Sequence, residues 1–148
     1  MSVSAEDLRA LGEARHPDPF AVLGPHRRAD GNTALRVFMP GAAAIAAVSA
    51  VDAGGDETGT GRQFAELQRA DDSDLFEGVI PGECAEAYLL QVRWQAGGVT
   101  LLEDPYRFPP LLGETDLWLL AEGTHRRPWQ ALGAHPVVVQ GVAGTRFA

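Results

Sequence analysis

Cysteine is nearly absent from this sequence of 148 residues. The single residue, Cys84, excludes an intrachain disulfide and a metal cage built from several thiolates. Lysine is missing altogether, so all 12 basic side chains are arginine. We attribute this uniform absence to the base composition of the genome and infer no function from it.

Long hydrophobic runs are also missing. The longest apolar stretches, at residues 42–51 and 117–121, are far shorter than the ~20 residues that span a bilayer. The N-terminus has no basic start followed by an apolar run, as a secretory signal would have. We therefore expect no membrane segment and a cytoplasmic location.

Basic residues are fewer than acidic residues. Asp and Glu number 20 against 12 arginines, which gives a formal net charge of −8. A surface of this sign repels the phosphate backbone, so nucleic-acid binding is not expected. Apolar residues make up 45% of the chain and charged residues 22%, which is the balance of a folded globular domain.

The spacing of apolar residues predicts one short helix followed by strands. The helix is expected at residues 4–15, with Ser4 as its N-cap and Asp7 completing a capping pattern, and the prolines at 17 and 19 end it. From residue 34 onward, short apolar runs alternate with glycine, proline and acidic turns. We predict six strands, at residues 34–39, 44–51, 63–68, 75–80, 88–95 and 99–102, and a flexible glycine-rich loop at 54–61.

One of these stretches shows which face is buried. Tyr88, Leu90, Val92 and Trp94 alternate with polar residues, as in a strand with one face in the core. Short antiparallel strands without long intervening helices indicate a sandwich rather than a βαβ fold. The predicted class is therefore mainly β: an immunoglobulin-like antiparallel β-sandwich with short peripheral helices.

A second short helix is expected near the end of the chain, at residues 116–122. Thr115 can cap its start and Gly123 can end it. Leu117, Leu120 and Ala121 would then form its buried stripe.

Two stretches of the sequence resemble each other. Residues 20–26 read Phe-Ala-Val-Leu-Gly-Pro-His and residues 129–135 read Trp-Gln-Ala-Leu-Gly-Ala-His, and each leads into a strand. A whole sandwich follows the first stretch, whereas the second reaches the end of the sequence inside its first strand. We interpret the second stretch as the start of a similar module that has been cut off.

Five motifs resemble bacterial glycogen branching enzymes. They lie at residues 16–26, 75–81, 104–108, 117–125 and 132–147, and Asp-Pro-Tyr-Arg-Phe at 104–108 with Glu-Gly-Thr-His at 122–125 is the most specific combination. The resemblance covers nearly the whole chain. It implies an N-terminal β-sandwich that precedes a starch-binding-like β-sandwich, an α-amylase-type barrel and a C-terminal β domain.

The resemblance also implies a domain organisation. Residues 1–15 would be an N-terminal helix, residues 16–126 the N-terminal β-sandwich module, and residues 127–148 a connector with the truncated start of a second carbohydrate-binding-type β-sandwich. The expected partners are that downstream sandwich and the α-amylase-type barrel of the same parent chain.

The family's reaction cleaves an α-1,4-glucan chain through a covalent glycosyl-enzyme and re-attaches it as an α-1,6 branch. This chemistry needs a carboxylate nucleophile and a carboxylic general acid that flank the bond. Those residues belong to barrel motifs that have no counterpart here. We therefore assign no catalytic residue and expect the chain alone to be inactive.

Four residues are predicted to contact glucan. Sugar sites combine aromatic rings with side chains that hydrogen-bond hydroxyl groups. Asp104, Tyr106 and Arg107 lie together in a proline-rich loop, and Trp129 precedes the interdomain connector. The alternative for the loop is a structural clamp that anchors it to the sandwich.

No metal or cofactor is expected. The four histidines, at 16, 26, 125 and 135, are not paired at ligand spacing, and hydrogen bonds in turns explain them better.

Two hypotheses for the function remain. One is an accessory module of a branching enzyme that aids binding of α-1,4-glucan (glycogen) or the choice of the transferred chain length, and the other is a purely structural or interaction domain without sugar contact.

Overall fold

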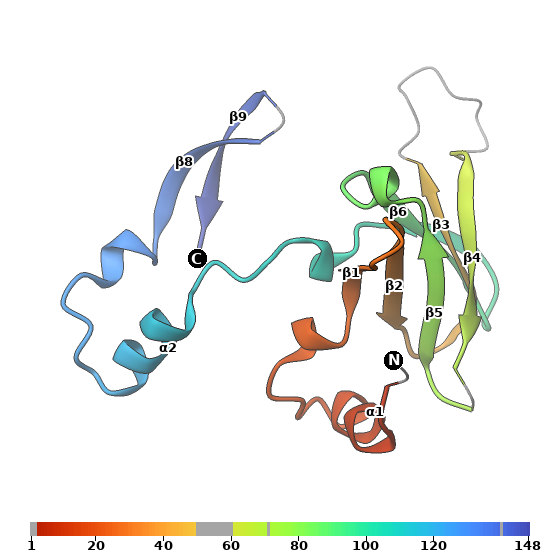
Figure 1. The fold of residues 1–148 in the computed structure, drawn as a ribbon, viewed down its shortest axis with the longest axis horizontal. Helices are drawn as coiled ribbons and strands as arrows, with labels where there is room; N and C mark the ends of the chain where they lie inside the picture. Colours follow the sequence, from red (N-terminus) through yellow and green to blue (C-terminus); the bar gives the residue numbers. More distant parts are fainter. Residues whose placement is uncertain (1–2, 50–60, 71, 140) are drawn as a thin grey trace. The chain divides into compact units, whose positions relative to one another are not determined.

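The computed structural model describes residues 3–49, 61–70, 72–139 and 141–148 (Figure 1). They form two compact units, Met1–Phe108 and Pro109–Ala148. The predicted glycine-rich loop at 54–61 lies outside the described residues apart from Gly61. The predicted boundary at residue 126 stays a prediction.

The first unit holds most of the secondary structure. In chain order its elements are α1 (Ala5–Gly12), the 3₁₀ turn η1 (Pro19–Ala21), β1 (Gly24–Arg27), β2 (Thr33–Phe38), β3 (Ala42–Ser49), β4 (Gln63–Arg69), β5 (Leu75–Ile80), η2 (Gly82–Cys84), β6 (Tyr88–Trp94), β7 (Val99–Leu102) and η3 (Pro105–Arg107). All six predicted strands are present, and β1 is an additional one.

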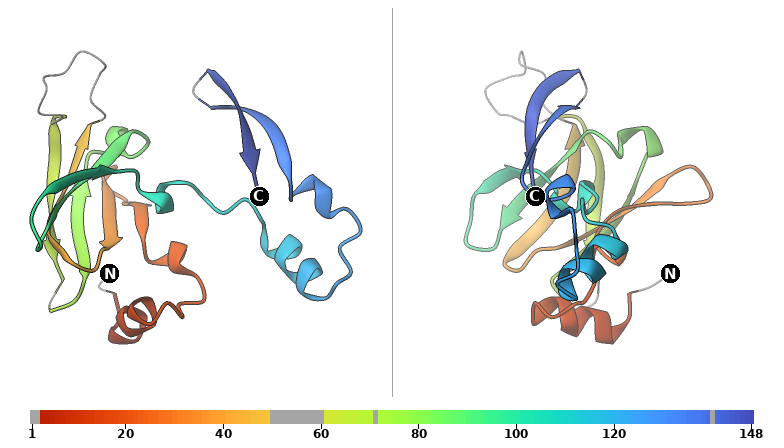
Figure 2. Two further views of the ribbon diagram at one scale, coloured as in Figure 1. Left: turned by 180° about the vertical axis from the view of Figure 1, so that it is seen from behind. Right: turned by 90° about the vertical axis from the view of Figure 1, so that its left-hand side faces the viewer.

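The strands of this unit form one antiparallel sheet that curls on itself. Their order is β1-β2-β5-β4-β3-β6-β7. The bend lies in β4, whose residues 63–67 pair with β3 whereas Gln68 and Arg69 pair with β5. Figure 2 shows the two halves of the sheet from behind and from the side. The prediction of a mainly β fold is confirmed, and the curled sheet is consistent with a β-sandwich.

The hydrophobic core lies between the two halves of the curled sheet. It is built from alternate residues of β2, β3, β5 and β6, because alternate side chains of a strand share one face. Tyr88, Leu90 and Val92 are at most 1% exposed and Trp94 packs against them, as predicted. Each fully buried side chain of this size stabilises the fold by roughly 1.5–3 kcal/mol.

The helix α1 covers part of the outer face of the sheet. Leu8 and Leu11, three positions apart on one side of the helix, pack against Val22, Leu23 and Leu75. The predicted capping pattern is confirmed. The Asp7 backbone N–H donates to Ser4 Oγ at 3.1 Å, and the Ser4 N–H donates to Asp7 Oδ2 at 3.3 Å.

Loss of this cap should destabilise the first unit. We expect Ser4→Ala to lower the free energy of unfolding by about 1 kcal/mol, because the Asp7 N–H loses its acceptor. Urea denaturation followed by circular dichroism measures the change. Thr115→Ala is the matched control and should be close to neutral, because Thr115 makes no capping hydrogen bond in the structure. An equal loss in both variants would contradict the assignment of Ser4 as N-cap.

The second unit contains α2 (Glu114–Ala121), η4 (Pro128–Gln130), β8 (Ala134–Val139) and β9 (Val142–Phe147). The predicted start and cap of α2 are wrong: Gly113 is the N-cap, and its N–H donates to Asp116 Oδ2 at 3.3 Å. The predicted stripe is not buried either. No residue of α2 is buried, and Leu117 is 53% exposed.

The second unit repeats the local structure at the start of the first. Helices α1 and α2 begin 109 residues apart, at Ala5 and Glu114, and η1 and η4 begin 109 residues apart, at Pro19 and Pro128. The hydrogen bonds of a histidine repeat as well. In the first unit, the Nε2 atom of His16 lies 3.2 Å from Asp7 Oδ1, and its Nδ1 atom accepts the Asp18 N–H. In the second unit, the Nε2 atom of His125 lies 3.0 Å from Asp116 Oδ1, and its Nδ1 atom accepts the Arg127 N–H. The sequence echo therefore extends to a repeated helix and turn.

Candidate functional site

The carboxylate of Asp104 is buried where the loop that contains η3 meets β6. The side chain is 2% exposed. The Tyr88 hydroxyl donates to its Oδ2 at 2.5 Å, and the Tyr106 backbone N–H donates to its Oδ1 at 2.9 Å. Both oxygens are therefore used within the fold.

Burial changes the acid strength of this pair. Desolvation raises the pKa of Asp104 above its usual value, although its two hydrogen bonds and the charge of Arg107 act in the other direction. Burial and the neighbouring carboxylate also raise the pKa of Tyr88. The tyrosine therefore stays protonated and acts as a hydrogen-bond donor.

Arg107 ties the same loop to β6. Its Nη1 donates to the Tyr88 carbonyl at 2.7 Å, and its Nη2 lies 2.7 Å from Glu103 Oε2. Its guanidinium carbon lies 5.6 Å from the centroid of the Tyr88 ring and 4.8 Å from that of Phe108. Arg107 therefore contacts protein groups on several sides.

Tyr106 packs inward rather than projecting from the loop. Its ring meets that of Phe20 edge-on, with centroids 5.0 Å apart. Its backbone lies against Gly24 at the start of β1, where a Cβ would come within 2.6 Å of the Tyr106 carbonyl oxygen. The structure thus brings Asp104, Tyr106 and Arg107 together in one anchored loop, which is the arrangement that the clamp alternative describes.

Trp129 lies in η4 of the second unit and is 64% exposed. In the repeated structure it occupies the position of Phe20, since both follow the first proline of a 3₁₀ turn. Its predicted role in glucan binding stays a prediction.

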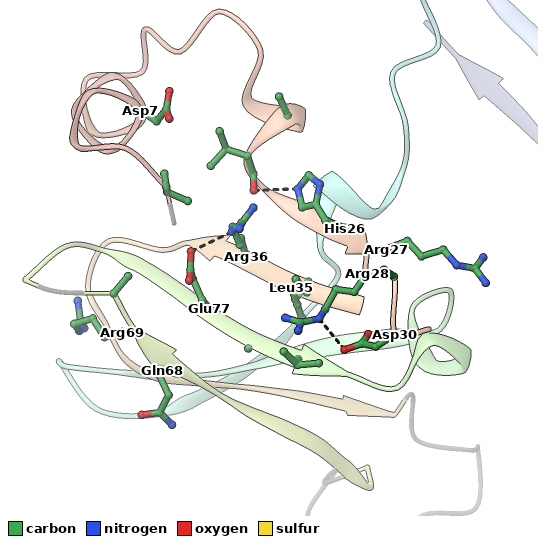
Figure 3. A pocket seen from close by; sticks show the side chains of 18 residues that line it. Asp7, His26, Arg27, Arg28, Asp30, Leu35, Arg36, Gln68, Arg69 and Glu77 are labelled. Carbon is green, nitrogen blue, oxygen red and sulfur yellow. Dashed lines mark hydrogen bonds and ion pairs between the residues drawn. The ribbon is translucent and has the colours of Figure 1, made fainter. Parts of the chain in front are cut away.

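A groove of about 1,110 Å³ opens on the outer face of the sheet beside α1 (Figure 3). Arg36 on β2 and Glu77 on β5 face each other across the strand pair, with Nε and Oε1 3.0 Å apart. In the β1–β2 hairpin, Arg28 Nε donates to Asp30 Oδ2 at 3.2 Å. None of these four residues was predicted from the sequence to belong to a site.

The carboxylates of this groove are already engaged. Glu77 is bound by Arg36, Asp30 by Arg28, and Asp7 by Ser4 and His16. The Asn32 N–H lowers the pKa of Asp30, and the Ser4 hydroxyl lowers the pKa of Asp7. Asp7 and Asp30 are therefore ionised at neutral pH and do not suit proton donation.

The histidines make the turn hydrogen bonds that were predicted. His26 Nε2 lies 3.0 Å from the Val22 carbonyl, and His135 Nε2 lies 3.1 Å from the Leu132 carbonyl. Among the described residues, no three His, Cys, Asp or Glu side chains are grouped as a metal site would require. No helix in the described part of the chain is long and apolar enough to cross a membrane.

Two of the solved structures that match this chain are related to each other. They are the catalytic module of the multi-modular glycogen-degrading pneumococcal virulence factor SpuA with and without an inhibitor, at 18% sequence identity and TM-scores of 0.42 and 0.41. The matches cover 68% and 67% of this chain and 14% of the other chain in each case.

Comparison with curated proteins gives much higher identity. Proteins named 1,4-alpha-glucan branching enzyme GlgB match at 44% identity in Rubrobacter xylanophilus, 43% in Pseudomonas syringae pv. tomato and 44% in Nitrobacter winogradskyi, over 97%, 98% and 99% of this chain. The chain spans 18–19% of the length of these relatives. The family model for the N-terminal domain of alpha-1,4-glucan branching enzyme GlgB matches residues 4–106. The chain therefore belongs to the family of GlgB N-terminal domains.

Proposed function

We propose that this chain is the N-terminal accessory part of an enzyme that cleaves an α-1,4-glucan chain and transfers it to form an α-1,6 branch. The observation that carries the proposal is the 43–44% identity with proteins named branching enzymes over nearly the whole chain. Glycosyl transfer of this kind needs a nucleophilic carboxylate and a carboxylic acid on either side of the bond. We assign that pair to the barrel of the parent protein.

The repeated helix and turn support a domain organisation for the parent. We propose that residues 127–148 contain the connector and the opening of a second carbohydrate-binding-type β-sandwich. The relatives are about five times as long as this chain, so further domains follow this region in them. The partners of the module would be that sandwich and the α-amylase-type barrel, in the cytoplasm.

Within this role, the module would contact glucan. Trp129 offers an exposed ring that can stack on a glucose unit. Asp104, Tyr106 and Arg107 would contribute by fixing the shape of their loop, since their polar groups are used within the fold. The same observation favours the second candidate function, a structural domain without sugar contact.

Titration with maltoheptaose distinguishes the two candidates. We expect the 148-residue chain to bind saturably at millimolar sugar with a change in tryptophan fluorescence, and to show no branching activity on amylose. Trp129→Ala should weaken binding about tenfold, as expected for the loss of one stacked ring.

Trp118→Ala is the matched control, because Trp118 lies in the same unit and is 62% exposed. Equal losses in both variants would contradict a specific role for Trp129. Absence of binding by the unchanged chain at millimolar sugar would favour the structural domain.

A further inference from the structure

A second groove, of about 560 Å³, lies within the first unit between η2, the β1–β2 hairpin and the end of the η3 loop. Its lining includes Arg27, Glu83, Glu86, Arg107 and Phe108. The volume falls in the range of roughly 300–1,000 Å³ that is usual for small-ligand sites. The groove is large enough for a short oligosaccharide.

Contacts within the protein hold the walls of this groove. Gly82 of η2 packs so closely on the carbonyl of Gly31, in the β1–β2 hairpin, that a Cβ there would overlap it. Arg107 is fixed by its hydrogen bond to the Tyr88 carbonyl and its ion pair with Glu103, both at 2.7 Å. A groove shaped in advance lowers the entropy cost of binding a ligand.

An exposed aromatic ring borders the groove. Phe108 is 53% exposed, although most large apolar side chains of this unit are buried. The guanidinium of Arg107 lies over the ring, with Cζ 4.8 Å from the centroid, and this contact orients it. The exposed part of the ring is a flat apolar surface, which matches the C–H face of a pyranose.

Hydrogen-bond donors and acceptors both lie beside this ring. Arg27, Glu83 and Glu86 are exposed, and among the described residues none of their three side chains has a hydrogen-bond or ion-pair partner. Carboxylates accept from hydroxyl groups and guanidinium groups donate to them. Two arginines balance two glutamates in the lining, which favours an uncharged ligand over a phosphate.

We propose that this groove binds a segment of α-1,4-glucan, with Phe108 stacked on one glucose unit and Glu83, Glu86 and Arg27 bound to its hydroxyl groups. The inference rests on the proposed function, which supplies glucan as the ligand. The four residues to which it assigns the contact, Phe108, Glu83, Glu86 and Arg27, differ from the four predicted from the sequence to contact glucan. The larger groove of Figure 3 has no Phe, Tyr or Trp among the described residues that line it.

Nuclear magnetic resonance titration of the ¹⁵N-labelled 148-residue chain with maltoheptaose tests the proposal. We expect saturable shifts at the backbone amides of Thr33, Gly82 and Glu83, which line the groove. Phe108→Ala should raise the dissociation constant at least about tenfold, because the stacked ring is lost. Phe108→Leu should have a similar effect, because leucine keeps apolar bulk but not a flat ring.

Val99→Ala is the control, because Val99 is 61% exposed in the same unit and lies outside the groove lining. It should bind maltoheptaose as the unchanged chain does. If the unchanged chain binds and both Phe108 variants bind equally well, the groove assignment is overturned while the proposed glucan contact stands. If the unchanged chain shows no binding at millimolar sugar, the groove and the glucan contact are both overturned.

Discussion

Replacing Asp104 by alanine is expected to lower the free energy of unfolding by about 3 kcal/mol, since a buried donor left without a partner costs roughly 1–3 kcal/mol. Two donors lose their acceptor together: the Tyr88 hydroxyl and the Tyr106 backbone N–H. Both lie where Asp104 is 2% exposed, so water has little access to replace the carboxylate. Urea denaturation followed by circular dichroism measures the loss.

The control for this prediction is Asp104→Asn. An amide can accept the Tyr106 N–H through its oxygen and donate to the Tyr88 hydroxyl through its nitrogen, so the asparagine variant should lose much less stability. If the alanine variant lost less than about 0.5 kcal/mol, as ordinary surface substitutions do, Asp104 would not be the anchor of the loop.

Comparison of Asp104→Asn with the unchanged chain tests the direction of the Asp104 pKa shift. The folded-state pKa lies above the usual value of 3.8, so the folded state holds the proton more tightly than the unfolded state. The contribution of Asp104 is therefore most favourable below the unfolded pKa and falls as pH rises through the folded pKa.

Asparagine does not titrate, so the stability of Asp104→Asn relative to the unchanged chain should rise with pH from about 4 upward. The lowered pKa values of Asp7, Asp30 and Asp116 give the opposite slope, but they are common to both proteins and cancel in the difference. A difference in melting temperature that falls with pH would contradict the raised pKa.

Strand prediction succeeded where turn residues mark both ends of an apolar run. Leu75–Ile80 and Val99–Leu102 were predicted with the bounds that the structure has, because acidic, proline and glycine turns flank them. β1 was missed because Gly24–Arg27 contains a glycine and a proline and little apolar character. The strand is possible because β1 lies at the edge of the sheet, where proline is tolerated.

The second helix shows two limits of sequence reasoning. Thr115 satisfies the usual N-cap preference, yet the carboxylate of Asp116 reaches back to the Gly113 N–H and starts the helix earlier. The five consecutive apolar residues at 117–121 run round α2 and indicate no single face for burial, and burial also needs a surface to pack on. The described residues of the second unit offer only a two-stranded sheet, which is too small to build a core by itself.

The sequence predicted that Asp104, Tyr106 and Arg107 lie together in one loop, but not that their side chains bind groups within the fold. The Tyr88 hydroxyl that binds Asp104 is 16 residues away in the sequence, and Arg36 and Glu77, which form the ion pair in the larger groove, are 41 residues apart. Such pairs depend on which strands are neighbours and in which register, and the local pattern of each strand does not show this for strands that are distant in the sequence. In the same loop, Tyr106 packs against Phe20, whereas Phe108 is 53% exposed.

Gly24→Ala is expected to destabilise the first unit by about 3 kcal/mol, from two causes that add. Gly24 has φ +87°, a left-handed conformation that costs an L-residue roughly 1–2 kcal/mol. A Cβ would also lie 2.6 Å from the Tyr106 carbonyl oxygen and 2.9 Å from Tyr106 Cβ. The backbone of the anchored loop would have to move away from β1, so Asp104 and Arg107 would lose their geometry together.

Gly31→Ala separates these two causes. Gly31 has φ +84°, and a Cβ there would meet nothing within 4 Å, so only the conformational cost of about 1 kcal/mol remains. Urea denaturation of both variants should show the Gly24 substitution to be the more damaging by about 2 kcal/mol, which is the cost of displacing a packed backbone. If both variants lost the same free energy of unfolding, the loop could move away from β1 at no cost. The close approach of Gly24 and Tyr106 would then not hold the loop on the sheet.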